Sequence, residues 1–326
     1  MSVLLTGATG RIGIIFARRL AQDGVPMRAL VRETSDTSEL DALGAESIVA
    51  HFDDEAGLAR AVEGCEVVYH LAVSRDASGA GSAQAVNVDG TERLARAAAR
   101  AGVSRFVHAS TLGVYGLVTG GVVDEHRPPR PNTLYRQTKL EGEVAVRRVE
   151  AETNLPVTIV RIPKVVGAGA VRWAGFYRAV ANQQIRLVGN GANRIQPVHN
   201  TDLVEALIRC GAASAAAGET YALAGPEAVS LRRFADLVAE ELGVPPPPPG
   251  PPALLHRLYL EAEDRLFRWT GRTLRGAHQR ELFVLDRATS TAKAERDFGY
   301  APSWAIEDSI HQMAEDFRQR ELIPRV

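Results

Sequence analysis

A tyrosine and a lysine, Tyr135 and Lys139, stand four residues apart in a segment with helical spacing of its apolar residues. On a helix, this spacing puts the phenol and the amine on one face, one turn apart. A phenol titrates near pH 10 in water, so it exchanges protons at neutral pH only where nearby positive charge lowers its pKa. The pair therefore predicts acid/base chemistry; the alternative is an ordinary solvent-facing pair.

The scarcity of lysine makes this spacing informative. Only Lys139, Lys164 and Lys293 are lysines among the 38 basic residues, and the chain has seven tyrosines. A Tyr-x-x-x-Lys match is then expected by chance about 0.06 times. A compact ammonium and a broad guanidinium are not interchangeable, so a lysine kept here in an arginine-rich chain indicates a specific role.

Two hydroxyl side chains, Ser110 and Thr111, follow the apolar run Phe106–Ala109. If this run is a strand of an open α/β sheet, its C-terminal end lies in the crevice where such sheets bind ligands. Thr111 is then placed to hydrogen-bond a substrate oxygen within reach of Tyr135. Ser110 is the rival for this role, and either hydroxyl could instead cap the strand end.

A glycine-rich turn separates the first apolar run from the first helical pattern, which is where a dinucleotide fingerprint belongs. Gly7 permits a tight turn, Gly10 lets the backbone approach a pyrophosphate, and Gly13 allows close helix packing. The pyrophosphate then sits at a helix N-terminus, where free N–H groups favour anions. The alternative is an accidental glycine-rich turn. The predicted coenzyme-binding residues here are Gly7, Gly10, Arg11, Ile12 and Gly13.

The end of the second apolar run predicts which nicotinamide coenzyme is preferred. An acidic residue there binds the ribose diol of NAD, whereas an arginine accommodates the extra phosphate of NADP. Val31 occupies the expected acidic position and Arg32 follows it. We therefore expect NADP(H), with NAD(H) possible and Arg11 as a second phosphate contact. The alternative is that Arg32 is a solvated charge and Glu33 binds the diol.

Short apolar runs alternate with helical patterns through the first half of the chain, which indicates an α/β, doubly wound parallel Rossmann sheet. The expected strands are Val3–Thr6, Met27–Val31, Ser47–Ala50, Val67–Leu71, Phe106–Ala109 and Val157–Arg161. The expected helices between them are Ile12–Asp23, Glu55–Val62, Asn87–Ala101 and Thr133–Glu152. We expect residues 1–165 to form the dinucleotide-binding domain, with some later segments returning to it.

Residues 166–326 are expected to form mainly a smaller, partly discontinuous substrate-binding lobe. Its expected helices are Trp173–Ala181, Thr201–Cys210 and Leu231–Leu242. The run Pro245–Pro249 predicts an extended spacer, with recruitment of an SH3-like partner as the alternative. Ala253–Trp269 predicts an amphipathic helix that either roofs the pocket or completes the core. Its apolar face is expected to hold Leu254, Leu255, Leu258, Tyr259, Leu266 and Phe267.

The composition is that of a globular protein, with 45% hydrophobic residues and a net charge of −1 over 326 residues. Acids match the many arginines, so no nucleic acid partner is expected. Cys65 and Cys210 form no Cys/His cluster, which argues against a metal site and for a reducing compartment. The sequence shows neither a secretory signal nor an apolar run that could span a bilayer, so we expect a cytoplasmic protein with no membrane partner.

These motifs together resemble the extended short-chain dehydrogenases/reductases, which include nucleotide-sugar epimerases, dehydratases and steroid dehydrogenases. The resemblance covers most of the chain. It rests on Thr6–Gly13, His70–Ala72, Asn87–Thr91, Ser110–Gly116, Tyr135–Lys139, Arg161–Pro163 and Val198–Asp202. It implies that Thr111 is the active-site hydroxyl, Tyr135 the acid/base and Lys139 also a ligand of the nicotinamide ribose. It further implies coenzyme contacts at Leu71, Ala72 and Pro163, and a homodimer through helices Asn87–Ala101 and Thr133–Glu152.

Departures from the family pattern narrow the expected function. Dehydratases of this family carry Asp-Glu after the active-site threonine, whereas this chain has Leu112-Gly113. Nucleotide-sugar enzymes commonly place an arginine where Ile195 stands, which puts diphosphate binding in doubt although Arg194 is adjacent. The usual aspartate beside the adenine is replaced by His51. We read His199 as a structural residue.

The sequence thus predicts an NADP(H)-dependent ketoreductase or alcohol dehydrogenase that acts on a small, fairly apolar molecule through Thr111, Tyr135 and Lys139. The alternative is an NAD-dependent nucleotide-sugar epimerase, in which bound NAD+ oxidises and then re-reduces one carbon. A coenzyme-sensing scaffold without turnover is a third class, which the complete Thr/Tyr/Lys set disfavours.

Overall fold

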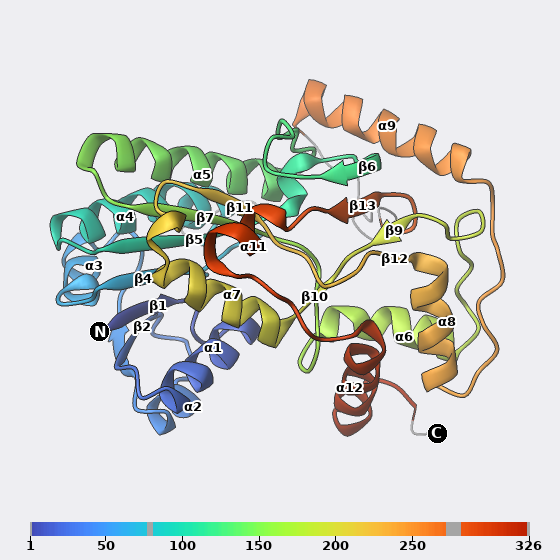
Figure 1. Ribbon diagram of the computed structural model, residues 1–326, viewed down its shortest axis with the longest axis horizontal. Helices are drawn as coiled ribbons and strands as arrows, with labels where there is room; N and C mark the ends of the chain where they lie inside the picture. The colour runs from blue at the N-terminus through green and yellow to red at the C-terminus, as the bar shows by residue number, and fades with distance from the viewer. Residues whose placement is uncertain (1, 77–80, 272–281, 325–326) are drawn as a thin grey trace.

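The computed structural model describes residues 2–76, 81–271 and 282–324 (Figure 1). Seven parallel strands form the central sheet in the order β11-β7-β5-β4-β1-β2-β3. Their bounds are β1 Val3–Thr6, β2 Met27–Val31, β3 Glu46–Val49, β4 Val67–His70, β5 Arg105–Thr111, β7 Val157–Ile162 and β11 Thr220–Ala222. This confirms the doubly wound parallel sheet, and every expected strand is present within two residues of its predicted bounds.

The chain order reverses between β1 and β4, so the crevice of the sheet opens at the ends of these two neighbouring strands. Helices cover both faces (Figure 1). One face carries α1 Arg11–Gln22, α2 Ser38–Ala42, α7 Asn200–Ala212 and α11 Ala292–Phe298; the other carries α3 Glu55–Val62, α4 Thr91–Arg100 and α5 Leu134–Thr153. Successive β1 residues serve the two cores, since Leu5 packs with the first set and Leu4 with the second.

A second lobe is built from three helices that share one hydrophobic core. These are α6 Ala174–Ala181, α8 Leu231–Glu241 and α12 Ile306–Gln319. Trp173, Phe176 and Tyr177 are buried in this core, where Trp173 and Phe176 both pack on Phe234. These aromatic residues therefore pack the core of the second lobe.

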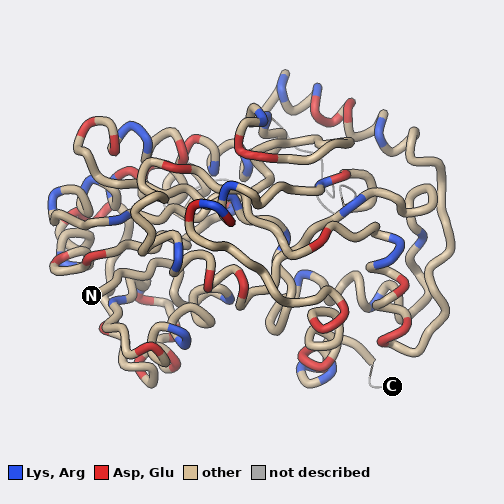
Figure 2. The backbone as a smooth tube through the Cα atoms, in the orientation of Figure 1, with Lys and Arg blue, Asp and Glu red and all other residues tan. Residues whose placement is uncertain are grey.

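Three two-stranded sheets connect the lobe to the rest of the chain. They pair β8 Val165–Val166 with β10 Val198–His199, β9 Arg194–Ile195 with β12 Val229–Ser230, and β6 Thr119–Val123 with β13 Asp286–Thr289. The alternation of short apolar runs did not predict these sheets, because strands of two residues carry no readable period. Acidic and basic residues are interspersed along the backbone (Figure 2).

The helix expected at Asn87–Ala101 is interrupted at its start. A π-helical turn, η1 Ala85–Gly90, precedes α4. The Asn87 amide donates to the Ser74 carbonyl at 2.9 Å and to Thr138 Oγ1 at 3.0 Å. The wider turn thus joins the loop after β4 to α5 through one side chain, which helical periodicity cannot predict.

The proline run and the helix that follows it differ in how well they were predicted. The run is extended, as expected, and is held to the lobe, since Arg232 Nη1 donates to the Pro247 carbonyl at 2.6 Å. Helix α9 Ala253–Thr270 is present at the rim of the molecule (Figure 1). Its expected apolar face was right in part, since Phe267 is buried and Tyr259 and Leu266 are partly buried. It was wrong for Leu254, Leu255 and Leu258, which are more than half exposed.

Candidate active site

Helix α5 carries the predicted acid/base pair at its N-terminal end. Thr133 caps the helix by accepting from the Arg136 amide, so Tyr135 lies in the first turn and Lys139 in the second. Tyr135 is partly exposed, and the Arg75 guanidinium carbon lies 4.5 Å from the centre of its ring. The phenol thus has a cation stacked on its ring, and the lysine follows it by one turn of the same helix.

Lys139 is almost completely buried, with 2% of its surface exposed. Its Nζ lies 3.4 Å from Nε2 of His108, which points from the middle of β5. Burial lowers the pKa of Lys139 to about 8, and the nearby Glu143 carboxylate opposes this change. Burial, followed by the Lys139 charge, holds the pKa of His108 well below its usual range. The neutral imidazole therefore accepts a hydrogen bond from the ammonium, a contact that the sequence did not reveal.

The structure distinguishes the two candidate hydroxyls at the end of β5. Ser110 is buried and its Oγ donates to Oε1 of Glu143. Thr111 is partly exposed, and its Oγ1 accepts from the Gly113 amide at 3.0 Å, which leaves the hydroxyl proton free to donate. The following turn lies against α5, since a Cβ at Gly113 would be 3.0 Å from Arg136 Nε. Thr111 is therefore the hydroxyl available at the start of α5.

A buried ion pair that sequence reasoning missed braces these elements. Arg161, from β7, contacts the Glu143 carboxylate through Nη2 at 2.7 Å and through Nε at 3.1 Å. Its Nη1 donates to the Tyr115 hydroxyl, which in turn donates to the Asp124 carbonyl. One network thus joins β5, α5 and β7. The sequence feature that could have indicated this ion pair is Glu143, an acidic residue one helical turn after Lys139.

The glycine turn after β1 is a cradle that side chains would fill. Gly7 has φ +70°, and a Cβ there would lie 2.8 Å from the Ala72 nitrogen and 2.9 Å from the Leu71 carbonyl carbon. A Cβ at Gly13 would lie 2.1 Å from the Gly7 oxygen. Helix α1 has no side-chain cap at Gly10 and no acidic residue in its first turn. These features fit a pyrophosphate bound at the helix N-terminus.

The remaining predicted coenzyme contacts lie around this cradle. Leu71 and Ala72 border Gly7 directly, and Pro163 follows β7 at the same edge of the sheet. Ile12 is partly buried and packs on the core of the first face. The Arg11 side chain extends to another loop, where a Cβ at Gly169 would be 3.3 Å from its Cγ.

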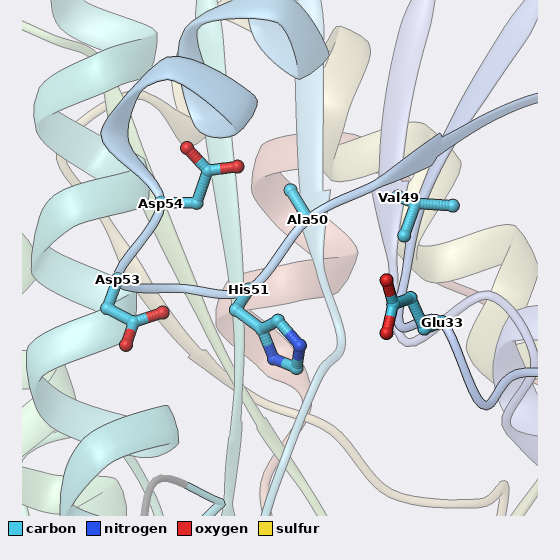
Figure 3. A pocket seen from close by; sticks show the side chains of 6 residues that line it. All are labelled: Glu33, Val49, Ala50, His51, Asp53 and Asp54. Carbon is cyan, nitrogen blue, oxygen red and sulfur yellow. The ribbon is translucent and has the colours of Figure 1, made fainter.

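A shallow pocket of about 450 Å³ lies at the ends of β2 and β3 (Figure 3). It is lined by Glu33, Val49, Ala50, His51, Asp53 and Asp54. Arg32 is exposed and does not line it, while Val31 is buried. The Arg32 amide donates to Ser35 Oγ at 3.2 Å, so a tight turn begins at this residue. The choice of coenzyme at this end of the sheet therefore depends on two side chains: Arg32, which could bind the extra phosphate of NADP, and Glu33, which could bind the ribose diol of NAD.

The residues at the positions expected to bind a nucleotide sugar make contacts within the protein instead. Arg194 forms an ion pair with Asp286, with Nε 2.8 Å from Oδ1, and Ile195 is buried. His199 is buried, stacks on Trp304 with ring centres 3.7 Å apart, and its Nε2 lies 2.9 Å from Gln312 Oε1. These contacts make His199 a structural residue.

Within the described ranges, no cluster of three or more His, Cys, Asp or Glu side chains could hold a metal ion. The helices of this same part of the chain include none that is both long and apolar enough to cross a membrane.

Comparison with known proteins gives a consistent result. Residues 3–224 match the sequence profile described as the NAD dependent epimerase/dehydratase family. Sterol demethylase protein B of Methylococcus capsulatus is 32% identical, with 99% of this chain and 100% of that protein covered. A 4-hydroxy-2-methyl-3-oxo-4-farnesyl-3,4-dihydroquinoline-1-oxide ketoreductase of Stigmatella aurantiaca is 28% identical over 92% of each chain. The crystal structure of gox2253 superposes with a TM-score of 0.82 at 29% identity, covering 99% of each chain.

Proposed function

The chain belongs to the NAD dependent epimerase/dehydratase family, and within it we propose a ketoreductase or alcohol dehydrogenase that interconverts a ketone and a secondary alcohol. The observation that carries this proposal is the arrangement at the start of α5. There, the partly exposed Tyr135 and the buried Lys139 lie one turn apart on α5, and Thr111, whose hydroxyl is available to donate, precedes a turn that packs on α5 at Arg136. This set suits proton transfer to an oxygen at the crevice of the sheet.

The roles follow from the position of each group. Tyr135 donates the proton to the substrate oxygen in reduction and accepts it in oxidation. Lys139 supplies positive charge that stabilises the phenolate, and Thr111 donates a hydrogen bond that holds the substrate oxygen. When bound in the glycine cradle, the nicotinamide coenzyme supplies or accepts the hydride. The Lys139 side chain also has donors for a ribose hydroxyl beside the ring.

Two observations favour this function over nucleotide-sugar epimerisation. Arg194, the nearest substitute for the usual diphosphate ligand, is paired with Asp286. Ile195 is buried at the position where an arginine would be needed. The names of two relatives refer to a sterol and to a farnesylated ketone, which supports a carbonyl or alcohol on a bulky apolar molecule as the substrate.

The test is a Tyr135→Phe variant, assayed for turnover and for coenzyme binding. We expect turnover to fall by about 10² to 10⁴, while the coenzyme Kd stays unchanged because the ring remains. Undiminished turnover would eliminate the mechanism. The coenzyme released on denaturation, identified by mass, separates the two functions, since tightly retained NAD+ favours an epimerase and freely exchanging coenzyme favours a reductase.

Membership of this family makes the enzyme NAD(P)-dependent, and we infer a preference for NADP(H). Arg32 supports it, because its exposed guanidinium at the end of β2 has no acidic partner in the described part of the chain. Glu33, which lines the adjacent pocket, is the residue that would bind a ribose diol instead. Arg32→Gln should weaken NADPH binding and leave NADH unaffected, as dissociation constants measured by fluorescence would reveal. An unchanged preference in Arg32→Gln, lost in Glu33→Gln, would assign the site to NAD(H).

We also propose a cytoplasmic homodimer that associates through α4 and α5. These helices pack together on one face of the sheet, and Val144 of α5 is 63% exposed. Both cysteines are free and buried, which suits a reducing compartment. Light scattering should give twice the mass of one chain, and Val144→Asp should halve it; a wild-type monomer would reject the dimer.

A further inference from the structure

Three arginines that are distant in the sequence lie within electrostatic reach of one another, and one of them stacks on Tyr135. Arg11 is the first residue of α1, Arg75 lies in the loop after β4, and Arg172 lies in the short turn η3 Val171–Trp173. Arg75 stacks on the Tyr135 ring, and Arg11 extends to Gly169, three residues before Arg172. The three positive charges repel one another. After burial, the charges of Arg172 and Arg75 lower the pKa of Arg11, and that of Arg75 lowers the pKa of Arg172.

These three residues, which we call the arginine cluster, share the absence of an acidic partner among the described residues. In the parts of the chain that the structure describes, Arg11, Arg75 and Arg172 have no ion pair within 4.0 Å, whereas Arg19 and Arg28 each have an acidic partner. Crowding like charges without a counter-ion destabilises the free protein. An arrangement of this kind is explained by an anion that binds there.

One anion, the coenzyme pyrophosphate, is already assigned to the N-terminus of α1, next to Arg11. It does not account for Arg75 and Arg172. Arg75 covers the phenol ring, with its guanidinium carbon 4.5 Å from the ring centre, and the charge of Arg172 interacts with Arg75 and with Tyr135. They therefore lie at the reacting end of the site, where the substrate binds.

Exposed apolar side chains accompany the arginine cluster. Val73 precedes Arg75 by two residues and is 47% exposed, and Val171 precedes Arg172 and is 49% exposed. Leu134, beside Tyr135, is 40% exposed. Exposed apolar residues next to unpaired cations match a ligand that is itself apolar with an anionic substituent.

We propose that Arg75 and Arg172 form a subsite for an anionic group, a carboxylate or a phosphate, carried by an apolar substrate close to the carbon that reacts. This inference rests on the proposed function, because it places the anion relative to Tyr135. It narrows the substrate class to hydroxy or keto acids, or phosphate esters, with a bulky apolar body.

The test measures binding to the full chain saturated with coenzyme. The probes are cyclohexanecarboxylate, the isosteric neutral cyclohexanecarboxamide, and inorganic phosphate, titrated by calorimetry. We expect the carboxylate to bind at least about tenfold more tightly than the amide, because charge-assisted hydrogen bonds to arginine replace neutral ones. Arg75→Gln and Arg172→Gln should each abolish this preference without changing the coenzyme Kd. Competition by phosphate against the carboxylate would favour a phosphate ester; its absence, a carboxylic acid.

Arg60→Gln is the matched control, since Arg60 is an exposed arginine of α3 on the other face of the sheet. It should retain the full carboxylate preference. The proposal is overturned if the wild type does not discriminate between the probes, if both variants keep the preference, or if they weaken coenzyme binding instead. Tyr135→Phe separates the two proposals, because it should keep the carboxylate preference whether or not it loses turnover.

Discussion

Replacing Lys139 with methionine should strongly reduce turnover without destabilising the protein. The ammonium is buried, and burial lowers the pKa of Lys139 from 10.5 to about 8. The folded protein therefore binds fewer protons than the unfolded chain between about pH 8 and pH 10.5. Stability should rise with pH across this window, and below pH 8 the buried charge should cost its full amount. At about 1.36 kcal/mol per pH unit, this amount is about 3 kcal/mol.

Lys139→Met removes this cost but leaves Nε2 of His108 without its donor, a loss of about 1–3 kcal/mol. At pH 7 the variant should thus be as stable as the wild type, or more stable by up to about 2 kcal/mol. Turnover should fall by at least about 10²-fold because the phenol loses its neighbouring charge. Urea unfolding of the coenzyme-free protein at pH 7, 8, 9 and 10 measures the first effect, and steady-state kinetics the second.

The pH dependence of the stability difference between the wild type and Lys139→Met is the decisive measurement. The wild type should gain stability relative to Lys139→Met as the pH rises from 8 to 10, and a difference that stays constant would refute a desolvated ammonium. Lys293→Met is the matched control, since this lysine pairs with Glu219 at 2.5 Å next to β11, away from Tyr135. It should keep turnover and lose at most about 1 kcal/mol of stability.

The other contacts of the site give predictions that single substitutions can check. Thr111→Ala should lower kcat by about tenfold or more with little effect on stability, whereas Ser110→Ala should cost about 1–3 kcal/mol of stability and spare kcat, because it leaves the Glu143 carboxylate short of a donor. The reverse pattern, seen in kinetics and urea midpoints, would exchange the two roles. Gly13→Ala should abolish coenzyme binding, since its Cβ would lie 2.1 Å from the Gly7 oxygen; a normal coenzyme Kd by fluorescence titration would contradict the cradle.

The parts of the fold that the sequence predicts are those where the backbone itself restricts residue type. Gly7 needs a positive φ and Gly13 needs the absence of a side chain, so both positions are readable without any knowledge of their surroundings. The central parallel strands β1, β4 and β5 are predictable because they are buried on both faces and form continuous apolar runs. The helix that carries Tyr135 and Lys139 is readable from its period and its threonine cap.

The parts that could not be predicted depend on partners distant in the chain. Nothing local to Ser110 shows that its hydroxyl donates to Glu143, which is 33 residues away in the sequence. Nothing local to Leu258 shows that its side of α9 faces outward, because amphipathic spacing defines a face but not what covers it. Pairing across 33 residues, or a missing neighbour, is a property of the tertiary fold.

The arginine cluster and Lys139 are all positive charges whose placement is unfavourable in the free protein. Lys139 is almost completely buried, and the charges of Arg11, Arg75 and Arg172, which have no acidic partners in the described ranges, act on one another. In the free protein, this concentration of charge is a cost, which the sheet and its two cores must offset. The same field stabilises a phenolate, a pyrophosphate and a substrate anion at once. A neutral substrate would leave the charges of Arg75 and Arg172 without a counter-ion, so an anionic substrate, a carboxylic acid or a phosphate ester, accounts for these two residues.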